Sequence, residues 1–243
     1  TNGLPQFIFR RQVGAANSTP GGLITNSAGG VANRLRGLYF TEGGAINQFV
    51  YGGLTFPSPT GAAVPTLTQG GSWQVNDSGR RIGLDPEDDR YGVFGRISYE
   101  VTDGIELFAE GAYNEQEVFF NAGPNLSTGV VLNATGCTQT PVPITCNAFL
   151  LNTLGAATLQ GITSVTVGTT FADLPFRVIN NRRAVQRYLV GAQGEFEAFG
   201  RTARWDIYGQ YGRAQLREQL RNIQNVARLN NATAVAFAPA GSG

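Results

Sequence analysis

The two cysteines are the side chains of this 243-residue sequence with the clearest chemistry, and they lie close together at Cys137 and Cys146. The intervening segment, GCTQTPVPITC, contains two prolines and several threonines. Such a short, Pro-containing spacing is typical of a disulfide that closes a small surface loop. A structural zinc site needs further Cys or His ligands, and the chain has neither. We therefore expect a Cys137–Cys146 disulfide, which implies an oxidising compartment such as the periplasm or cell surface.

A second candidate for chemistry is an acidic cluster at Asp85, Glu87, Asp88 and Asp89. A calcium site takes six to eight oxygen ligands from a defined loop, and the spacing of an EF-hand is absent. We therefore favour a solvated segment at the entry of a strand and expect no metal.

Several catalytic chemistries are excluded because the residues that they need are missing. The chain contains no His, no Met and no Lys, so all 18 cationic residues are Arg. Ser-His, Cys-His and Schiff-base catalysis are therefore unavailable, as are His metal sites. A hydrolase could still use two carboxylates, but no pair stands out. We expect no enzymatic activity and no cofactor, and the net charge of +1 gives no reason to expect a nucleic-acid partner.

The composition indicates strands separated by many turns. The chain has 33 Gly, 14% charged residues and 10% aromatic residues, which is too apolar and aromatic for disorder. Gly together with β-branched and aromatic residues favours an all-β protein. No apolar run approaches 18 residues, so a transmembrane helix is not expected and any membrane insertion would use strands.

The clearest structural signal is a hairpin from Tyr91 to Tyr113, with a tight turn at Thr102-Asp103-Gly104. Residues alternate between an apolar and a polar stripe on both sides of the turn, over a length that suits tilted strands crossing a bilayer. The apolar, lipid-facing stripe contains Val93, Ile97, Tyr99, Leu107 and Tyr113, and the polar, lumen-facing stripe contains Arg96, Glu100, Glu106 and Glu110.

A second hairpin follows the same pattern, with a short connection around Gly200. Aromatic residues lie near the ends of the apolar stripes in both hairpins, as in the aromatic girdles of membrane barrels. Here the lipid-facing stripe contains Tyr188, Val190, Phe196, Trp205, Ile207 and Tyr211, and the lumen-facing stripe contains Arg187, Glu195, Arg204 and Asp206.

An ordinary antiparallel sandwich would also alternate apolar and polar residues. Two features favour the membrane: small residues stand beside aromatics in the apolar stripes, and the connections differ greatly in length. We predict loops with short strands at 1–89, a barrel hairpin at 90–119 and a long extracellular loop at 120–181. We also predict a second barrel hairpin at 182–215, and a strand end and loop at 216–243. Within the long loop, the stretch 148–158 is apolar enough for one or two helical turns.

Two blocks carry a family resemblance: LDPEDDRYGVFGRISYEVTDGIELFAEGAYNEQE from Leu84, and NNRRAVQRYLVGAQGEFEAFGRTARWDIYGQYGRAQ from Asn180. Both resemble barrel strands of TonB-dependent receptors of sphingomonads and related proteobacteria. PGGLIT near Pro20 and YFTEGGAINQFVYG from Tyr39 resemble loop pieces of the same proteins. The resemblance covers most of the chain, weakly in the loops, and its motifs are strand patterns, which do not specify a substrate.

The resemblance implies an internal segment of an outer-membrane barrel of about 22 strands, since no signal peptide, TonB box or plug is recognisable. It implies a bacterial outer-membrane receptor that takes up a scarce nutrient: a ferric siderophore, cobalamin or a carbohydrate. The implied partners are outer-membrane lipid, the nutrient, and the TonB complex acting through a plug outside this chain.

The sequence leaves two further questions open. The strands could instead assemble between copies, as in a secreted or surface fibre or layer, because unpaired strand edges self-associate. Four arginines, Arg182, Arg183, Arg217 and Arg221, could attract an anion such as a ferric chelate or lipopolysaccharide, although ordinary surface arginines are the favoured interpretation.

Overall fold

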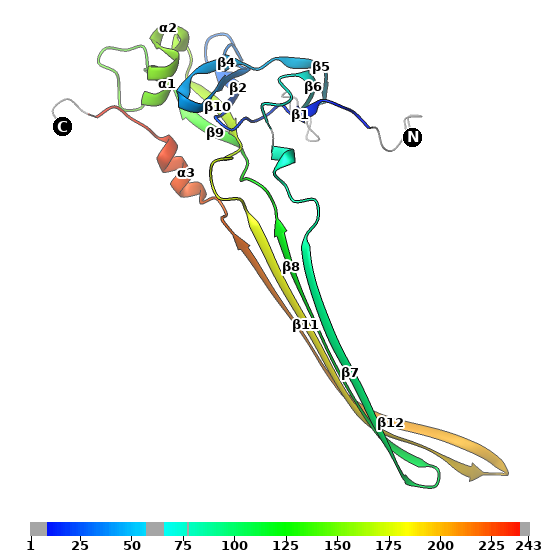
Figure 1. The fold of residues 1–243 in the computed structure, drawn as a ribbon. Helices are drawn as coiled ribbons and strands as arrows, with labels where there is room; N and C mark the ends of the chain where they lie inside the picture. Colours follow the sequence, from blue (N-terminus) through cyan, green and yellow to red (C-terminus); the bar gives the residue numbers. More distant parts are fainter. Residues whose placement is uncertain (1–8, 57–65, 77, 239–243) are drawn as a thin grey trace. The chain divides into compact units, whose positions relative to one another are not determined.

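The computed structural model describes residues 9–56, 66–76 and 78–238, and it is dominated by antiparallel β-strands (Figure 1). The chain divides into two compact units. Unit 1 contains residues 1–82, 123–177 and 222–243, and unit 2 contains residues 83–122 and 178–221. None of the described helices combines the length and hydrophobicity that crossing a bilayer requires.

Unit 2 is a single four-stranded antiparallel sheet, with the strand order β12-β11-β8-β7. Its strands are long: β7 spans Glu87–Thr102, β8 Ile105–Asn121, β11 Val178–Ala198 and β12 Arg201–Arg221. Alternating apolar and polar residues support this extended conformation, because successive side chains of a strand point to opposite faces. The two hairpins are joined through the β8–β11 pair, in which Val178 lies opposite Asn121 and Gly194 opposite Ile105.

Two-residue turns join the strands of each hairpin. Asp103 and Gly104 connect β7 to β8, and Gly104 has a φ of 83°. Phe199 and Gly200 connect β11 to β12, with φ values of 52° and 72°. The second turn therefore holds a bulky residue in the left-handed region, where Gly or Asn is usually found.

Unit 1 contains two small sheets. One has the order β1-β6-β5, from Val13–Ala15, Leu67–Gly71 and Tyr51–Phe56. The other has the order β4-β3-β2-β10-β9. Its strands, in that order, are Ile46–Gln48, Leu38–Phe40, Leu23–Ala28, Ser164–Thr169 and Ser127–Asn133.

Short helices complete unit 1. The predicted helical turns near 148–158 are confirmed as α1 (Ala148–Leu154) and α2 (Ala156–Leu159). The tail, predicted as a strand end and loop, completes β12 at Arg221 and then forms α3 (Val226–Thr233). Two 3₁₀ turns lie at Glu42–Gly44 and Ser78–Arg80.

The segments predicted as separate long loops share one hydrophobic core. Ile24 from β2, Val165 from β10 and Leu150 from α1 are fully buried in the same cluster, which also includes both cysteines. Loops before the first hairpin and between the two hairpins thus fold into one unit.

Candidate functional site: a sheet with an apolar and a charged face

The register of the four-stranded sheet places the two predicted stripes on opposite faces. Tyr99 lies opposite Leu107, which lies opposite Ala192, and Ala192 lies opposite Ile207. The apolar face therefore carries every residue that the sequence predicts to face lipid: Val93, Ile97, Tyr99, Leu107, Tyr113, Tyr188, Val190, Phe196, Trp205, Ile207 and Tyr211. The charged face carries every residue predicted to face a lumen: Arg96, Glu100, Glu106, Glu110, Arg187, Glu195, Arg204 and Asp206.

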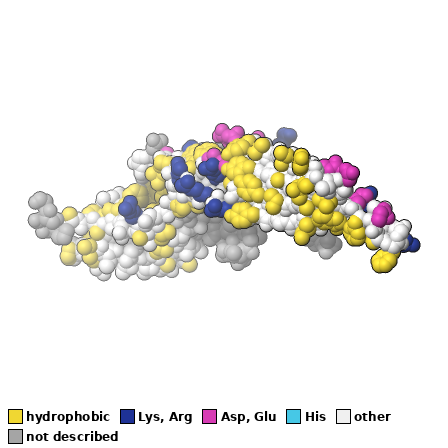
Figure 2. Space-filling view, turned by 90° about the horizontal axis from the view of Figure 1, so that it is seen from below, with side chains coloured by type: hydrophobic (Ala, Val, Ile, Leu, Met, Phe, Trp, Pro, Cys, Tyr) yellow, Lys and Arg dark blue, Asp and Glu magenta, His cyan; other side chains and the backbone are white. Residues whose placement is uncertain are grey.

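The apolar face is open rather than packed. Ile97 is 71% exposed, Ile207 67% and Val190 63%. Figure 2 shows hydrophobic side chains over a broad area of the sheet, with acidic and basic side chains at its borders. A contiguous apolar surface of this kind marks a site of contact with another apolar medium or molecule.

Glycines on the apolar face make room for aromatic rings on the neighbouring strand. Tyr188 lies opposite Gly111, and a Cβ added at Gly111 would be 3.7 Å from the Tyr188 ring. Trp205 lies opposite Gly194, where an added Cβ would be 2.9 Å from the indole Nε1. The small residues of the stripe are thus the cross-strand partners of large rings, an arrangement known to support glycines in sheets.

The charged face is held by pairs of side chains that lie opposite each other in register. Arg96 contacts Glu110 at 2.9 Å and Arg204 contacts Glu195 at 2.8 Å. Gln193 donates a 2.8 Å hydrogen bond to Glu106. These contacts show that many charges of this face satisfy one another across the strands.

The charged face also carries large apolar and aromatic side chains. Phe94 is 66% exposed and Tyr208 57%. The Phe108 ring lies 4.9 Å from the Arg96 guanidinium carbon, as in a cation–π contact. The charged face is therefore amphipathic, although the alternation of the sequence predicts a polar stripe.

The apolar face ends at a row of four tyrosines, Tyr91, Tyr113, Tyr188 and Tyr211. Beyond this row, on the side away from the two turns, the same face carries charged side chains. One register row runs across all four strands through Asp89, Glu117, Arg182 and Arg217. The two acids lie on β7 and β8, and the two arginines lie on β11 and β12. Like charges are neighbours at both ends of this row, a placement that destabilises a sheet unless other partners compensate.

Glu115 offsets the positive charge of Arg182. The Arg182 Nε lies 2.6 Å from the Glu115 Oε1, and the Tyr113 hydroxyl donates a hydrogen bond to the same carboxylate. The hydrogen bond from Arg182, followed by that from Tyr113, lowers the pKa of Glu115 to about 2. The same contact raises the pKa of Arg182.

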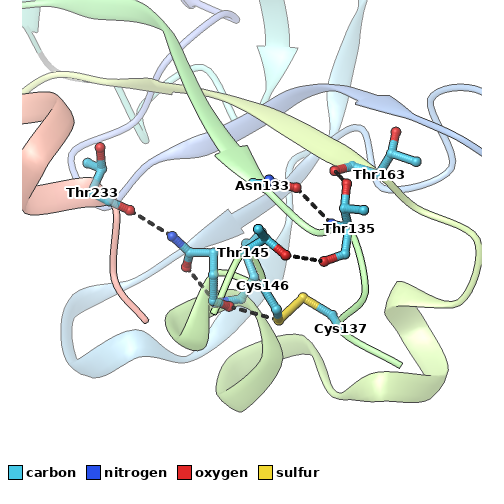
Figure 3. The surroundings of a disulfide bond; sticks show 9 residues. Asn133, Thr135, Cys137, Thr145, Cys146, Thr163 and Thr233 are labelled. Atoms are coloured by element: carbon cyan, nitrogen blue, oxygen red, sulfur yellow. Dashed lines mark hydrogen bonds between the residues drawn. A yellow bond between two sulfur atoms is a disulfide. The ribbon is translucent and has the colours of Figure 1, made fainter. Parts of the chain in front are cut away.

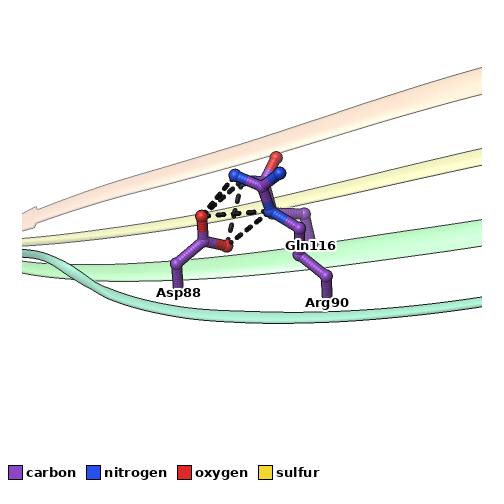
Figure 4. A network of polar contacts seen from close by, with 3 residues as sticks. All are labelled: Asp88, Arg90 and Gln116. Atoms are coloured by element: carbon purple, nitrogen blue, oxygen red, sulfur yellow. Dashed lines mark hydrogen bonds and ion pairs between the residues drawn. The ribbon is translucent and has the colours of Figure 1, made fainter.

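The acidic cluster before the first hairpin partly joins the sheet, because β7 begins at Glu87. Asp88 accepts hydrogen bonds from the Arg90 guanidinium and from the Gln116 amide on β8 (Figure 4). These bonds lower the pKa of Asp88. Within the described part of the chain, no group of three or more His, Cys, Asp or Glu is arranged to hold a metal ion.

The predicted disulfide between Cys137 and Cys146 is present in unit 1, with both residues buried (Figure 3). Asn147, the residue after the second cysteine, accepts a 3.1 Å hydrogen bond from the Leu150 backbone and thereby caps α1. Its amide group donates a 2.7 Å hydrogen bond to the Thr233 carbonyl at the end of α3. Asn147, next to the disulfide, therefore links the start of α1 to the end of α3.

Unit 1 also contains a cavity of about 400 Å³ that sequence analysis could not have located. Its lining comes from segments far apart in the chain and is free of charged side chains. Phe40, Phe149 and Val167 supply apolar surface, while Asn147 and Thr233 supply polar groups.

The comparisons with known proteins leave the family open. No model of a protein family matches the chain, and neither a curated protein nor a solved structure shows significant similarity to it.

Proposed function

We propose that the four-stranded sheet is a membrane-spanning segment of a bacterial outer-membrane β-barrel, and that the chain is part of a TonB-dependent receptor for a scarce nutrient. The observation that carries the proposal is the exposed apolar face. In water such a face is costly, since each Å² of apolar surface left exposed forgoes about 25 cal/mol of stabilisation. In a bilayer the same face is the one that lipid covers.

The dimensions of the apolar face support a bilayer. Tyr91, Tyr113, Tyr188 and Tyr211 border it on one side, and Tyr99, Phe196 and Trp205 lie toward the turns. On β7 and β11 the stretches Tyr91–Tyr99 and Tyr188–Phe196 are nine residues long, as a tilted strand requires to cross the hydrocarbon core, and on β12 the stretch Trp205–Tyr211 is seven residues long. Ion pairs such as Arg182–Glu115 lie outside this band.

The connections support the same assignment. Both two-residue turns lie at one end of the sheet, while residues 122–177 connect β8 to β11 at the other end. Barrels of the outer membrane have short periplasmic turns and long extracellular loops. By this assignment unit 1 is extracellular and determines which nutrient binds.

The receptor hypothesis requires further strands. Within the described residues, β7 and β12 each pair on one edge only. An open edge in lipid leaves backbone groups without hydrogen bonds, at several kcal/mol each. Other strands of the barrel would cover both edges, and a plug inside the barrel would transmit the pull of the TonB complex. The proposed activity is transport, with no bond broken and no cofactor.

The two tryptophans allow a direct test, because Trp205 lies on the apolar face and Trp73 lies in unit 1. The protein is reconstituted in vesicles whose lipids carry bromine on the acyl chains, which quench nearby tryptophans. The Trp73→Phe variant reports Trp205 alone, and we expect strong quenching. The matched Trp205→Phe variant reports Trp73, and we expect none. Unquenched Trp205 would overturn the membrane assignment.

The two long open edges also favour a second candidate, a secreted or surface protein whose sheets pair between copies in a fibre or layer. This protein would be soluble before assembly and would form filaments or layers in lipid-free buffer as its concentration rises. A receptor segment would instead need detergent or lipid at every concentration.

A further inference from the structure

We infer that the edge strand β12 carries a binding site for the phosphate groups of anionic membrane lipids, just beyond the apolar face. The site consists of Arg213, Gln215, Arg217, Gln219 and Arg221, which we call the basic ladder. The inference rests on the proposed membrane position of the sheet and adds a ligand to it.

The basic ladder follows from the alternation of the strand. Every second residue after Tyr211 lies on the apolar face, so five successive positions there are Arg or Gln. All three arginines are exposed. Two residues of a strand span about 7 Å, so successive arginines lie about 13 Å apart, with an amide side chain between them. The ladder thus offers several hydrogen-bond donors along one line.

The register shows that the ladder has an excess of positive charge. Arg217 lies directly opposite Arg182, and Arg182 already donates to Glu115 at 2.6 Å. Arg221 donates to the neutral amide oxygen of Gln219 at 3.1 Å. A bound anion would offset the repulsion between the facing arginines.

Acidic side chains do not neutralise the ladder from its own side of the sheet. On the apolar face beyond the tyrosines, β11 and β12 carry no acid between residues 178 and 221, all of which are described. Glu218 of β12 points to the opposite face, by its place in the alternation. The acids of the apolar face, Asp89, Glu115 and Glu117, lie on β7 and β8.

The position of the ladder identifies its ligand as a lipid headgroup. Arg213 follows Tyr211 by two residues, so the ladder begins where the apolar face ends. A lipid whose chains cover Ile207 and Tyr211 would present its phosphate at this level. Guanidinium groups match phosphate oxygens in bidentate geometry, and basic residues beside a membrane attract anionic lipids.

The test compares lipid binding by two triple variants that remove the same charge. Arg213→Gln/Arg217→Gln/Arg221→Gln removes the ladder, and Arg183→Gln/Arg187→Gln/Arg204→Gln removes three arginines from the charged face. Binding of phosphatidic acid and of chain-matched phosphatidylcholine to the purified protein is measured by native mass spectrometry. We expect the ladder variant to bind phosphatidic acid on the order of ten- to a hundredfold more weakly, and the control variant to bind as the wild type does.

Three outcomes would overturn the inference. The first is equal weakening in both variants, which would show a general charge effect. The second is unchanged binding in the ladder variant; lower thermal stability in that variant would further place the acid partner of the ladder on a neighbouring strand. Inorganic phosphate at equal concentration should not displace the lipid if the chains contribute; displacement would identify a free-phosphate site and also contradict the inference. Trp205 quenching, measured in the same variants, separates a failed ladder from a failed membrane assignment.

Discussion

The indole of Trp205 on β12 covers Gly194, the residue directly opposite it on β11. An added Cβ at Gly194 would lie 2.9 Å from the indole nitrogen and 2.5 Å from the Gly104 carbonyl oxygen. The strand therefore has no room for a side chain here, because one of the obstructing atoms is backbone.

Gly194→Ala should consequently destabilise the sheet by about 1–3 kcal/mol, the usual range for overpacking. Gly111→Ala is the matched control, because its Cβ would meet the Tyr188 ring at an ordinary 3.7 Å. We expect the control to change stability by less than about 0.5 kcal/mol. Denaturant unfolding of both variants measures the difference, and equal effects would contradict this role of Gly194.

The turn between β11 and β12 offers a stabilising substitution. Phe199 has a φ of 52° and is fully exposed. Its side chain therefore makes no packing contacts that would offset the strain of the backbone. Phe199→Asn or Phe199→Gly should stabilise the hairpin by about 0.4–1 kcal/mol, because both residues tolerate positive φ. Gly200→Ala, at a φ of 72°, should destabilise it. An increase in stability from the alanine variant would argue against this turn geometry.

The Arg182–Glu115 pair predicts an acid dependence of stability. The pKa of Glu115 is lowered from its ordinary 4.5 to about 2 in the folded protein. Its contribution is therefore fully present above pH 4.5 and is lost as the pH falls from 4.5 toward 2. Glu115→Gln should flatten the pH dependence of the unfolding midpoint in this window. Glu117→Gln, one register row away, is the control, and equal flattening there would refute the assignment.

The disulfide should stabilise unit 1 by about 2–3 kcal/mol, as expected for closing a short loop. Cys137→Ala/Cys146→Ala, or reduction of the wild type, should lower the unfolding temperature of unit 1. Because the bond lies in the core of unit 1, the hairpins of unit 2 should retain their hydrogen-exchange protection. Loss of protection in both units at once would show that they unfold as one.

The sequence predicted the hairpins well because period-two alternation and an Asp-Gly turn are local signals. The register places the residues of each predicted stripe together on one face of the sheet. Alternation underestimated the strand lengths, since β7 starts at Glu87 and β12 reaches Arg221. Residues 87–90 are all charged, and beyond Tyr211 the apolar residues of β12, such as Leu216 and Leu220, lie on the opposite face from the predicted apolar stripe. A run that is charged on both faces has no hydrophobic period to detect, and an apolar stripe that changes face does not continue the predicted pattern.

The fold of unit 1 could not be predicted in the same way. Its strands are short, and β2 pairs with β10, so that Val165 lies opposite Ser27. Pairings between such distant segments depend on burial of the whole core rather than on a local pattern. For the same reason the cavity lined by Phe40, Phe149 and Thr233 had no sequence signal.

The row Asp89, Glu117, Arg182 and Arg217 gives the sheet a transverse electrical polarity, negative toward β7 and positive toward β12. A strand added beside β7 is favoured when a base faces Asp89. Sliding that strand by two residues would keep its apolar side chains on the apolar face but would separate the two charges. The row thus acts as an alignment mark, which distinguishes registers that hydrophobicity alone treats as equivalent.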